Sequence, residues 1–272
     1  MEADQEGGKS GHALDKPGVP ANSRAGRMRT FLARRFIALG QKLTGRHALI
    51  PELEPEDEAL LDAARGLSMT APVAQWEFIQ AIRHIEGSHV PGDIVECGVW
   101  RGGNLVIAGL LRNRLGFDRR IWAYDTFAGM TAPTAADFKP AEHFDVERKF
   151  ASLNRGDRND WCLASEEEVL RNFEHRVGNR GLQVVKGPVE ETLAKSANLP
   201  DEIAILRLDT DFYESTKVEM EVLYPRLAKG GVLIVDDYGE WAGARKAVDE
   251  YFAGQAVWLH YVTHTVRLMI KP

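Results

Sequence analysis

The segment IVECGVWRGGN, residues 94–104, decides the fold class of this chain. Its first residues form a short apolar run that predicts a buried β-strand over 94–99, and the glycines that follow are typical of a tight turn into a helix. Such a turn lets a ligand approach the backbone, beside the unpaired N–H groups at the helix start. The alternative is an ordinary tight turn without a ligand. The spacing Gly-x-x-x-Gly-Gly differs from the dinucleotide-binding Gly-x-Gly-x-x-Gly, so it favours a ligand without a pyrophosphate over the turn.

Strands and helices alternate on both sides of this segment. We expect strands over 94–99, 121–126, 182–186, 203–208 and 232–235, and helices near 56–66, 72–84, 103–114, 166–177, 190–196, 214–228 and 241–253. Apolar strands alternating with helices indicate a parallel sheet that is buried on both faces. The chain ends in two consecutive strands, 257–262 and 266–270. We therefore predict an α/β, Rossmann-like fold of the class I methyltransferase type, a doubly wound and mostly parallel sheet closed by a C-terminal antiparallel hairpin.

The composition excludes several classes of protein. The chain has 272 residues, of which 44% are hydrophobic and 27% charged, as in an ordinary soluble globular protein of one large or two small domains. No apolar run approaches the ~20 residues that cross a bilayer, and no secretory signal is recognisable. The two cysteines, Cys97 and Cys162, supply neither a disulfide scaffold nor, alone, a zinc site. We expect a cytoplasmic protein.

The N-terminal part of the chain differs from the rest. Residues 1–23 are rich in Gly, Pro, Ser and charge, so we predict a disordered tail. Residues 24–46 hold seven Arg or Lys, no acid, and apolar residues at helical spacing, which predicts a basic amphipathic helix within the segment 24–66. That helix suits an anionic membrane surface, but we favour a role in covering the body or a partner subunit. The acidic remainder argues against nucleic acid as a partner.

Two acids frame a predicted cofactor pocket. Asp125 ends the second strand, where doubly wound nucleoside-binding proteins place an acid on the ribose hydroxyls. A carboxylate suits a vicinal diol because it accepts two hydrogen bonds side by side. Glu96, at the end of the first strand, is a candidate acceptor for the ammonium group of a bound amino-acid moiety. A nucleoside carrying an amino acid fits this outline, and S-adenosylmethionine is such a ligand.

Four aspartates follow two strands that should be neighbours in the sheet. Asp209 and Asp211 follow strand 203–208, whereas Asp236 and Asp237 follow strand 232–235. Oxygen ligands alone favour a hard divalent cation such as Mg²⁺, although acids at strand ends can also be simply hydrated. The Asp-x-Asp pattern also fits the start of a haloacid-dehalogenase-like phosphatase. That alternative is weaker, since the phosphatase motif follows the first strand of its fold.

The motifs in combination resemble those of the macrocin O-methyltransferase family, over roughly residues 67–272. The similar segments are ECGVWRGG (96–103), YDTFAGM (124–130), LDTDFYEST (208–216) and VDDY (235–238). The resemblance implies a metal-dependent enzyme that uses S-adenosylmethionine. It implies further that Asp209, Asp236 and Asp237 hold Mg²⁺, that Asp211 is the general base, and that residues 186–189 lie near the adenine. The C-terminal residues 264–271 and the basic segment 24–46 depart from the family, so the identity of its acceptor does not carry over.

These observations predict an O-methyltransferase that acts on a hydroxyl of a sugar or glycosylated small molecule, and the resemblance implies a homodimer. His264 competes with Asp211 for the role of base, because its unperturbed pKa lies near neutrality. The long segment 128–164 suggests a lid over the acceptor. A cofactor-binding protein without turnover is the alternative from another class. The predicted cofactor-binding residues are Glu96, Gly98, Val99, Trp100, Arg101, Gly102, Gly103, Asn104, Asp125, Thr126, Phe127, Gly187 and Asp209.

Overall fold

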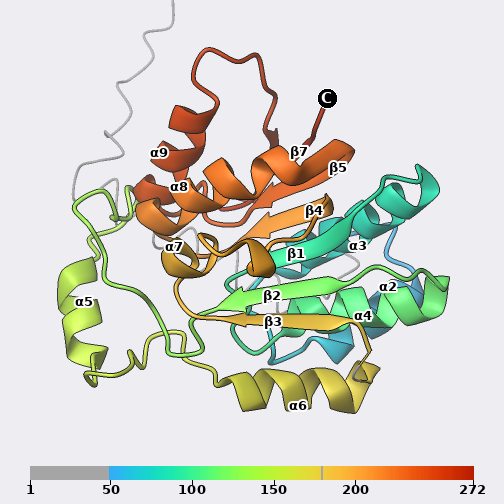
Figure 1. Cartoon of the computed structure of the whole chain (residues 1–272), viewed down its shortest axis with the longest axis horizontal. Coiled ribbons are helices and arrows are strands. Elements are labelled where there is room, and N and C mark those ends of the chain that lie inside the picture. Colours follow the sequence, from blue (N-terminus) through green and yellow to red (C-terminus); the bar gives the residue numbers. More distant parts are fainter. Residues whose placement is uncertain (1–48, 179) are drawn as a thin grey trace, which may run out of the picture.

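The computed structural model describes residues 49–178 and 180–272 (Figure 1). The predicted disordered tail over 1–23 and the predicted basic helix over 24–46 lie outside these residues. Within the described ranges, no helix is both long enough and apolar enough to cross a membrane.

The described part of the chain forms a seven-stranded sheet in the order β3-β2-β1-β4-β5-β7-β6. Strands β1 to β5 run parallel, whereas β7 is antiparallel to both β5 and β6. The predicted doubly wound sheet with a C-terminal antiparallel hairpin is thus confirmed. The strands are β1 (Asp93–Cys97), β2 (Ile121–Asp125), β3 (Leu182–Lys186), β4 (Ile203–Leu208), β5 (Leu227–Val235), β6 (His260–Tyr261) and β7 (Arg267–Ile270).

Helices cover both faces of the sheet (Figure 1). One face carries α2 (Pro55–Ala63), α3 (Pro72–Gly87), α4 (Gly103–Leu115) and α6 (Glu166–Val177). The other carries α7 (Val189–Thr192), α8 (Tyr213–Val222) and α9 (Ala242–Tyr251). Because the central strands are buried on both sides, their sequences are nearly continuous apolar runs.

The order of the strands reverses between β1 and β4. From β1 the chain builds outward through β2 and β3, and it then returns to place β4 and β5 on the other side of β1. In open α/β sheets, ligands bind beyond the carboxyl ends of the strands at such a point. The loops that follow β1, β2, β4 and β5 all meet there.

Several predicted boundaries were wrong. The helix expected over 190–196 is only the four-residue α7, followed by a 3₁₀ turn at Ser196–Asn198. The helix expected over 214–228 ends at Val222, because a 3₁₀ turn at Tyr224–Arg226 leads into β5, whose first residue Leu227 pairs with Ile203 of β4. The strand expected over 257–262 contains only the two residues of β6.

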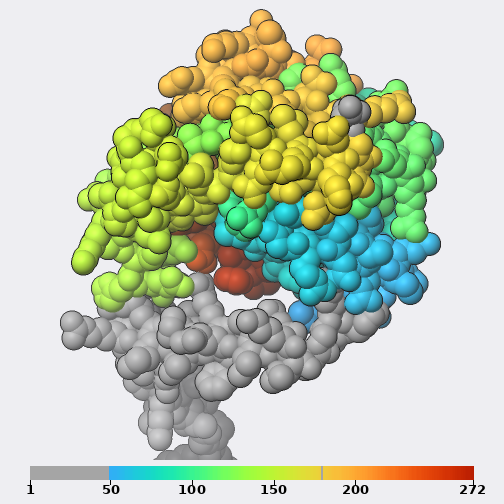
Figure 2. Space-filling model, turned by 90° about the horizontal axis from the view of Figure 1, so that it is seen from below, coloured from blue at the N-terminus to red at the C-terminus, as the bar shows by residue number. Residues whose placement is uncertain are grey.

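The segment 128–164 is an ordered excursion rather than a plain loop. It contains helix α5 (Val146–Leu153), and Figure 2 shows it (yellow-green) gathered at one side of the molecule, next to α6 (yellow). Its two ends are joined where Asn159 N donates to Ala128 O at 2.8 Å and Met130 N donates to Trp161 O at 3.1 Å. Gly129 is required at this junction, since a Cβ there would lie 1.8 Å from the carbonyl oxygen of Asn159.

Candidate active site

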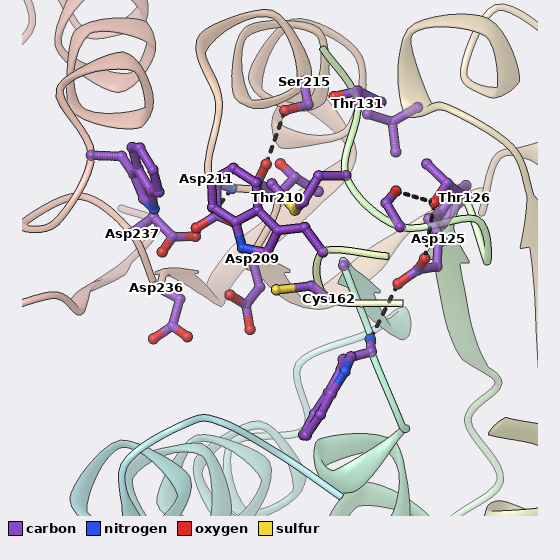
Figure 3. Close-up of a pocket in the computed structure, with 18 of the residues that line it drawn as sticks. Asp125, Thr126, Thr131, Cys162, Asp209, Thr210, Asp211, Ser215, Asp236 and Asp237 are labelled. Carbon is purple, nitrogen blue, oxygen red and sulfur yellow. Dashed lines mark hydrogen bonds between the residues drawn. The ribbon is translucent and has the colours of Figure 1, made fainter. Parts of the chain in front are cut away.

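A cavity of about 470 Å³ lies at the carboxyl ends of the central strands. Figure 3 shows four aspartates together on one side of it, Asp125 with Thr126 on the other, and Cys162 between them. The excursion supplies part of its wall. The residues that line it include Gly98, Trp100, Asp125, Met130, Thr131, Lys139, Trp161, Gly187, Asp209, Asp211, Asp236, Asp237, Glu240 and Trp241.

The glycines of the first turn serve contacts within the protein. Gly98 has φ +79°, and a Cβ on it would lie 1.9 Å from the carbonyl oxygen of Asp209. A Cβ on Gly103 would lie 2.6 Å from the side chain of Ser68. Gly98 lines the cavity, but what excludes a side chain at both positions is neighbouring protein. Both glycines thus let neighbouring segments pack closely, and their contact with a ligand stays a prediction.

Asp125 joins the loops after β1 and β2. Its Oδ2 accepts hydrogen bonds from Val99 N at 2.8 Å and Trp100 N at 3.1 Å, and its Oδ1 accepts from Phe127 N at 2.8 Å. Burial raises the pKa of Asp125, whereas these amides oppose that rise. Asp125 also lines the cavity, so its carboxylate both shapes the pocket and faces it.

Glu96 lies in a buried polar network that centres on Arg207. Arg207 is only 1% exposed, and its Nε donates to Glu96 Oε1 at 3.0 Å. Asn104, on α4, donates to the same oxygen at 2.8 Å. Glu96 is not among the residues that line the cavity, although its Oε2 is buried without a hydrogen-bond partner in the described structure. Its contact with a cofactor ammonium group remains a prediction.

Arg207 also reaches the aspartates. Its Nη2 donates to Asp209 Oδ2 at 2.7 Å, to Asp236 Oδ2 at 2.8 Å and to Thr70 Oγ1 at 2.9 Å. Burial opposes the charge on the guanidinium, but the surrounding carboxylates outweigh it and raise the pKa of Arg207. One buried cation thus compensates part of the negative charge on the two neighbouring strand ends.

The four aspartates converge as predicted, because β4 and β5 are adjacent and parallel. Burial raises the pKa of Asp209, and the charge of Asp236 raises it further. Burial likewise raises the pKa of Asp237, with a further contribution from Asp211. These neighbouring carboxylates carry more negative charge than the single positive charge of Arg207 can neutralise.

Asp211 adopts an unusual backbone conformation. β4 ends at Leu208 and Asp211 has φ +67°, so the chain is not extended at Asp211. Burial and the charge of Asp209 raise the pKa of Asp211 to about 7, against the opposing effects of Asp237, Lys139 and Trp241. A carboxyl with a pKa near neutrality is suited to take up a proton.

The metal site receives mixed support from the geometry. Across residues 49–178 and 180–272, no three His, Cys, Asp or Glu side chains are arranged to hold a metal ion. The donor chemistry nevertheless fits a divalent cation, since Asp209, Asp236 and Asp237 offer only oxygen ligands in a region with excess negative charge. The magnesium site therefore remains a prediction.

Another part of the cavity wall contains a cation and aromatic rings. Lys139 Nζ forms an ion pair with Glu240 Oε1 at 2.8 Å and lies 4.8 Å from the ring centre of Trp241. Trp161 packs against Trp241 at 6.1 Å between ring centres. Lys139 and Trp161 come from the excursion, so part of the predicted lid does border the cavity.

His264 lies away from this centre. Its side chain is 59% exposed and its Nε2 is 4.0 Å from Glu240 Oε2, whereas the neighbouring Thr265 lines the cavity. The geometry thus gives Asp211, and not His264, a direct position in the wall of the cavity.

Comparison with known proteins identifies the family. The family described as macrocin-O-methyltransferase matches residues 59–260, which is most of the chain. The chain belongs to the macrocin-O-methyltransferase family. The resemblance drawn from the motifs is thereby confirmed.

Relatives within the macrocin-O-methyltransferase family include two curated enzymes of Streptomyces. The chain is 39% identical over 176 residues to demethyldecarbamoylnovobiocin O-methyltransferase of Streptomyces niveus, covering 64% of this chain and 63% of that protein. It is 38% identical over 165 residues to 8-demethyl-8-(2,3-dimethoxy-alpha-L-rhamnosyl)-tetracenomycin-C 4'-O-methyltransferase of Streptomyces olivaceus, covering 60% and 58%. These matches span about three-fifths of the length of the curated relatives.

A solved structure supports the same relationship. The structure of the O-methyltransferase NovP superposes with a TM-score of 0.64 at 30% identity, covering 79% of this chain and 88% of that one. The methyltransferase fold predicted from the order of strands and helices is thus confirmed.

Sequence reasoning missed Arg207 in this member of the macrocin-O-methyltransferase family, although a signal was present. Arg207 is the single charged residue in the apolar strand IAILRL, residues 203–208. A lone cation in a strand that is buried on both faces needs buried acids as partners. Lys139 and Trp161 carried no such signal, because their position depends on how the excursion folds back.

Proposed function

We propose that this protein transfers a methyl group from S-adenosylmethionine to a hydroxyl of a sugar on a glycosylated small molecule. The observation that carries the proposal is one cavity with Asp125 on one side and Asp211 on the other. Membership of the macrocin-O-methyltransferase family and the names of its relatives support the same chemistry. The activity and the acceptor are inferences for this chain.

The loops after β1, β2 and β3 would hold the cofactor. Asp125 is fixed by the amides of Val99, Trp100 and Phe127, so its carboxylate is oriented before a ribose diol arrives. Gly187, which also lines the cavity, would border the adenine. S-adenosylmethionine, when bound there, would supply the methyl group to the acceptor oxygen and leave as S-adenosylhomocysteine.

Asp211 would accept the hydroxyl proton. Its backbone N–H donates to Asp237 Oδ2 at 3.2 Å, which fixes the loop that carries it. Lys139 and Trp241 both favour the ionised form of Asp211. Asp237 thus fixes the backbone at Asp211, whereas Lys139 and Trp241 offset part of the rise in its pKa caused by burial and Asp209.

Asp209, Asp236 and Asp237 would hold a divalent cation. When bound there, the cation would lower the pKa of a coordinated sugar hydroxyl and help to fix its position. Arg207 holds Oδ2 of Asp209 and of Asp236, so these two side chains keep their orientation before a ligand binds.

The excursion and the start of α9 would receive the acceptor. Trp161, Trp241 and Met130 offer apolar surface, and Thr131 with the Lys139–Glu240 pair offers hydrogen-bonding groups. A sugar ring presents both kinds of surface.

Cytoplasmic location and a homodimer stay predictions, and sedimentation of the full chain would measure its oligomeric state.

A labelling experiment tests the function. The full chain would be incubated with methyl-labelled S-adenosylmethionine, Mg²⁺ and a panel of glycosylated small molecules lacking one O-methyl group, alongside an extract of its source cells. We expect label in a product that releases methylated sugar on acid hydrolysis. Label in no product, with S-adenosylmethionine bound normally, would favour the alternative of a cofactor-binding protein without turnover.

The phosphatase alternative loses its support in the structure. Asp209 follows β4 in the middle of a methyltransferase sheet, and not the first strand that the phosphatase motif requires. The chain belongs to a methyltransferase family over most of its length.

A further inference from the structure

The backbone at Asp211 is a tight turn of an uncommon kind. Phe212 N donates to Thr210 O at 2.7 Å, so Asp211 is the central residue of a three-residue turn, and it has φ +67°. For a residue other than glycine, this conformation is strained and persists only where the surroundings enforce it. Three neighbouring parts of the fold contact the turn or the residue that directly follows it, Tyr213.

Two of these contacts come from elements near the aspartates and the aromatic wall. Asp211 N donates to Asp237 Oδ2 at 3.2 Å, which joins the turn to the end of β5. The next residue, Phe212, is buried, and its ring packs edge-on against Trp241 at 5.3 Å and Trp161 at 6.1 Å between ring centres.

The third contact is the carboxylate of Asp137, in the excursion. Asp137 is only 3% exposed, and its Oδ1 accepts a hydrogen bond from Tyr213 N at 2.7 Å, two residues after Asp211. Its Oδ2 accepts from Thr134 N at 2.7 Å and from Thr134 Oγ1 at 2.8 Å. Both oxygens of this buried carboxylate are thus engaged, one with the excursion and one with the start of α8.

The start of α9 packs closely against the same carboxylate. A Cβ on Gly243 would lie 2.0 Å from Asp137 Oδ1. The adjacent Ala242 N donates to Phe138 O at 2.9 Å, so the excursion also pairs with α9 through its backbone. Residues 134–139 therefore bridge the loop after β4 and the loop after β5, which carry all four aspartates.

We propose that Asp137 is a positioning residue for Asp211. By accepting from Tyr213 N, it holds the strained turn in the form that presents Asp211 to the cavity, and it joins that turn to the excursion. This inference rests on the proposed function of Asp211 as the base. The hydrogen bond from Tyr213 N to Asp137 Oδ1, which we call the tie between the excursion and the turn, does not depend on that function.

Three variants test the role of Asp137. Asp137→Ala removes the tie, Asp137→Asn keeps one oxygen that can accept from Tyr213 N, and Gly243→Ala introduces a methyl group where Asp137 Oδ1 lies. The matched control is Asp145→Ala, which removes an exposed aspartate from the same excursion, where it accepts from Arg148 N at 2.9 Å at the start of α5. Each is compared with the unaltered full chain.

Two measurements need no acceptor. Hydrogen–deuterium exchange would follow the peptide covering 210–216, and calorimetry would measure the affinity for S-adenosylhomocysteine. We expect faster exchange in Asp137→Ala and Gly243→Ala, with affinity within about twofold of the unaltered chain. Methyl transfer to the acceptor found by the labelling experiment should then show kcat lowered by ~10²-fold, as for a small misplacement of a reacting group, with KM little changed.

The conservative variant and the control separate positioning from stability. Asp137→Asn should recover part of the lost kcat, and Asp145→Ala should match the unaltered chain in kcat and in exchange over 210–216. Unaltered exchange and kcat in Asp137→Ala would overturn the inference. So would loss of S-adenosylhomocysteine binding equal to the loss of kcat, which is the result of general unfolding. If the unaltered chain transfers no methyl group, the proposed function fails, while the exchange data still decide whether the tie exists.

Discussion

Glu96 and Arg207 lie directly opposite each other on neighbouring strands. The register of β1 and β4 makes them partners, and Arg207 Nε donates to Glu96 Oε1 at 3.0 Å. Through its Nη2, Arg207 also holds Asp209 and Asp236. The strand that would meet the amino-acid end of the cofactor is therefore joined to the aspartates by one buried guanidinium.

Removing this guanidinium should destabilise the protein severely. Arg207→Met leaves three carboxylates without their buried cation, and we expect the free energy of unfolding to fall by ~3–5 kcal/mol. Unfolding in guanidinium chloride would measure this loss of stability. The control is Arg65→Met, because Arg65 is 70% exposed and pairs with Asp62 on the surface, where a pair contributes at most about 1 kcal/mol. Equal losses in both variants would contradict the role given to Arg207.

Asp125 should contribute to cofactor affinity. We expect Asp125→Ala to leave the sheet intact and to weaken S-adenosylhomocysteine binding by ~1–3 kcal/mol, since the ribose loses a charge-assisted acceptor. Calorimetry measures the affinity, with Asp118→Ala, an exposed aspartate paired with Arg180, as the control. Unchanged affinity in Asp125→Ala would remove the ribose assignment.

Turnover should depend on a divalent cation. We expect EDTA to abolish methyl transfer and added Mg²⁺ to restore it, because Asp209, Asp236 and Asp237 would hold the ion. Asp236→Asn and Asp237→Asn should each shift the Mg²⁺ titration of the rate to higher concentration. Full activity in metal-free buffer would show instead that these aspartates act without a metal.

The base can be tested against its competitor. Asp211→Asn should lower kcat by ~10²–10⁴-fold and leave S-adenosylhomocysteine affinity unchanged, which is the usual effect of losing a general base. His264→Gln should cost far less, because His264 is 59% exposed and is not among the lining residues of the cavity. A dead His264→Gln beside an active Asp211→Asn would reverse the assignment.

Glu219 should make stability depend on pH. It is fully buried on α8, where burial raises the pKa of its carboxyl far above the ordinary value, and its Oε2 is 3.1 Å from Thr210 Oγ1. The unfolded chain ionises this group near pH 4.3, whereas the raised pKa lets the folded chain keep the proton to higher pH. The folded state therefore loses stability as the pH rises above that value.

Glu219→Gln should remove this loss. We expect the variant to be more stable than the unaltered chain at pH 7–8 by about 1–3 kcal/mol, and the difference to shrink as the pH falls toward 4. Urea unfolding at several pH values would show it. Glu221→Gln, on an exposed position of the same helix, should show no such trend. A difference that is independent of pH would argue against a buried proton on Glu219.

The sequence alone determined the architecture and the gathering of the acids. Strands β3 and β4 begin and end at the predicted residues, because short apolar runs bounded by polar residues are local signals. The convergence of Asp209, Asp211, Asp236 and Asp237 also followed from sequence, since it needs only that two parallel strands be neighbours. The hairpin after α9 was predicted from two consecutive short apolar runs, although its first strand is shorter than expected.

Only the tertiary structure decided what these groups contact. Gly98 must be glycine because the carbonyl of Asp209 lies against it, and those two residues are far apart in the chain. The turn at Asp211 depends on Asp137, which the excursion brings back from between β2 and β3. Such contacts depend on register and on how a long excursion packs, and neither leaves a periodic pattern in the sequence. The physical reason is that the burial of a strand is visible in its own apolar sequence. The hydrogen-bond partner of a buried polar group, in contrast, comes from a distant segment and depends on how the whole chain folds.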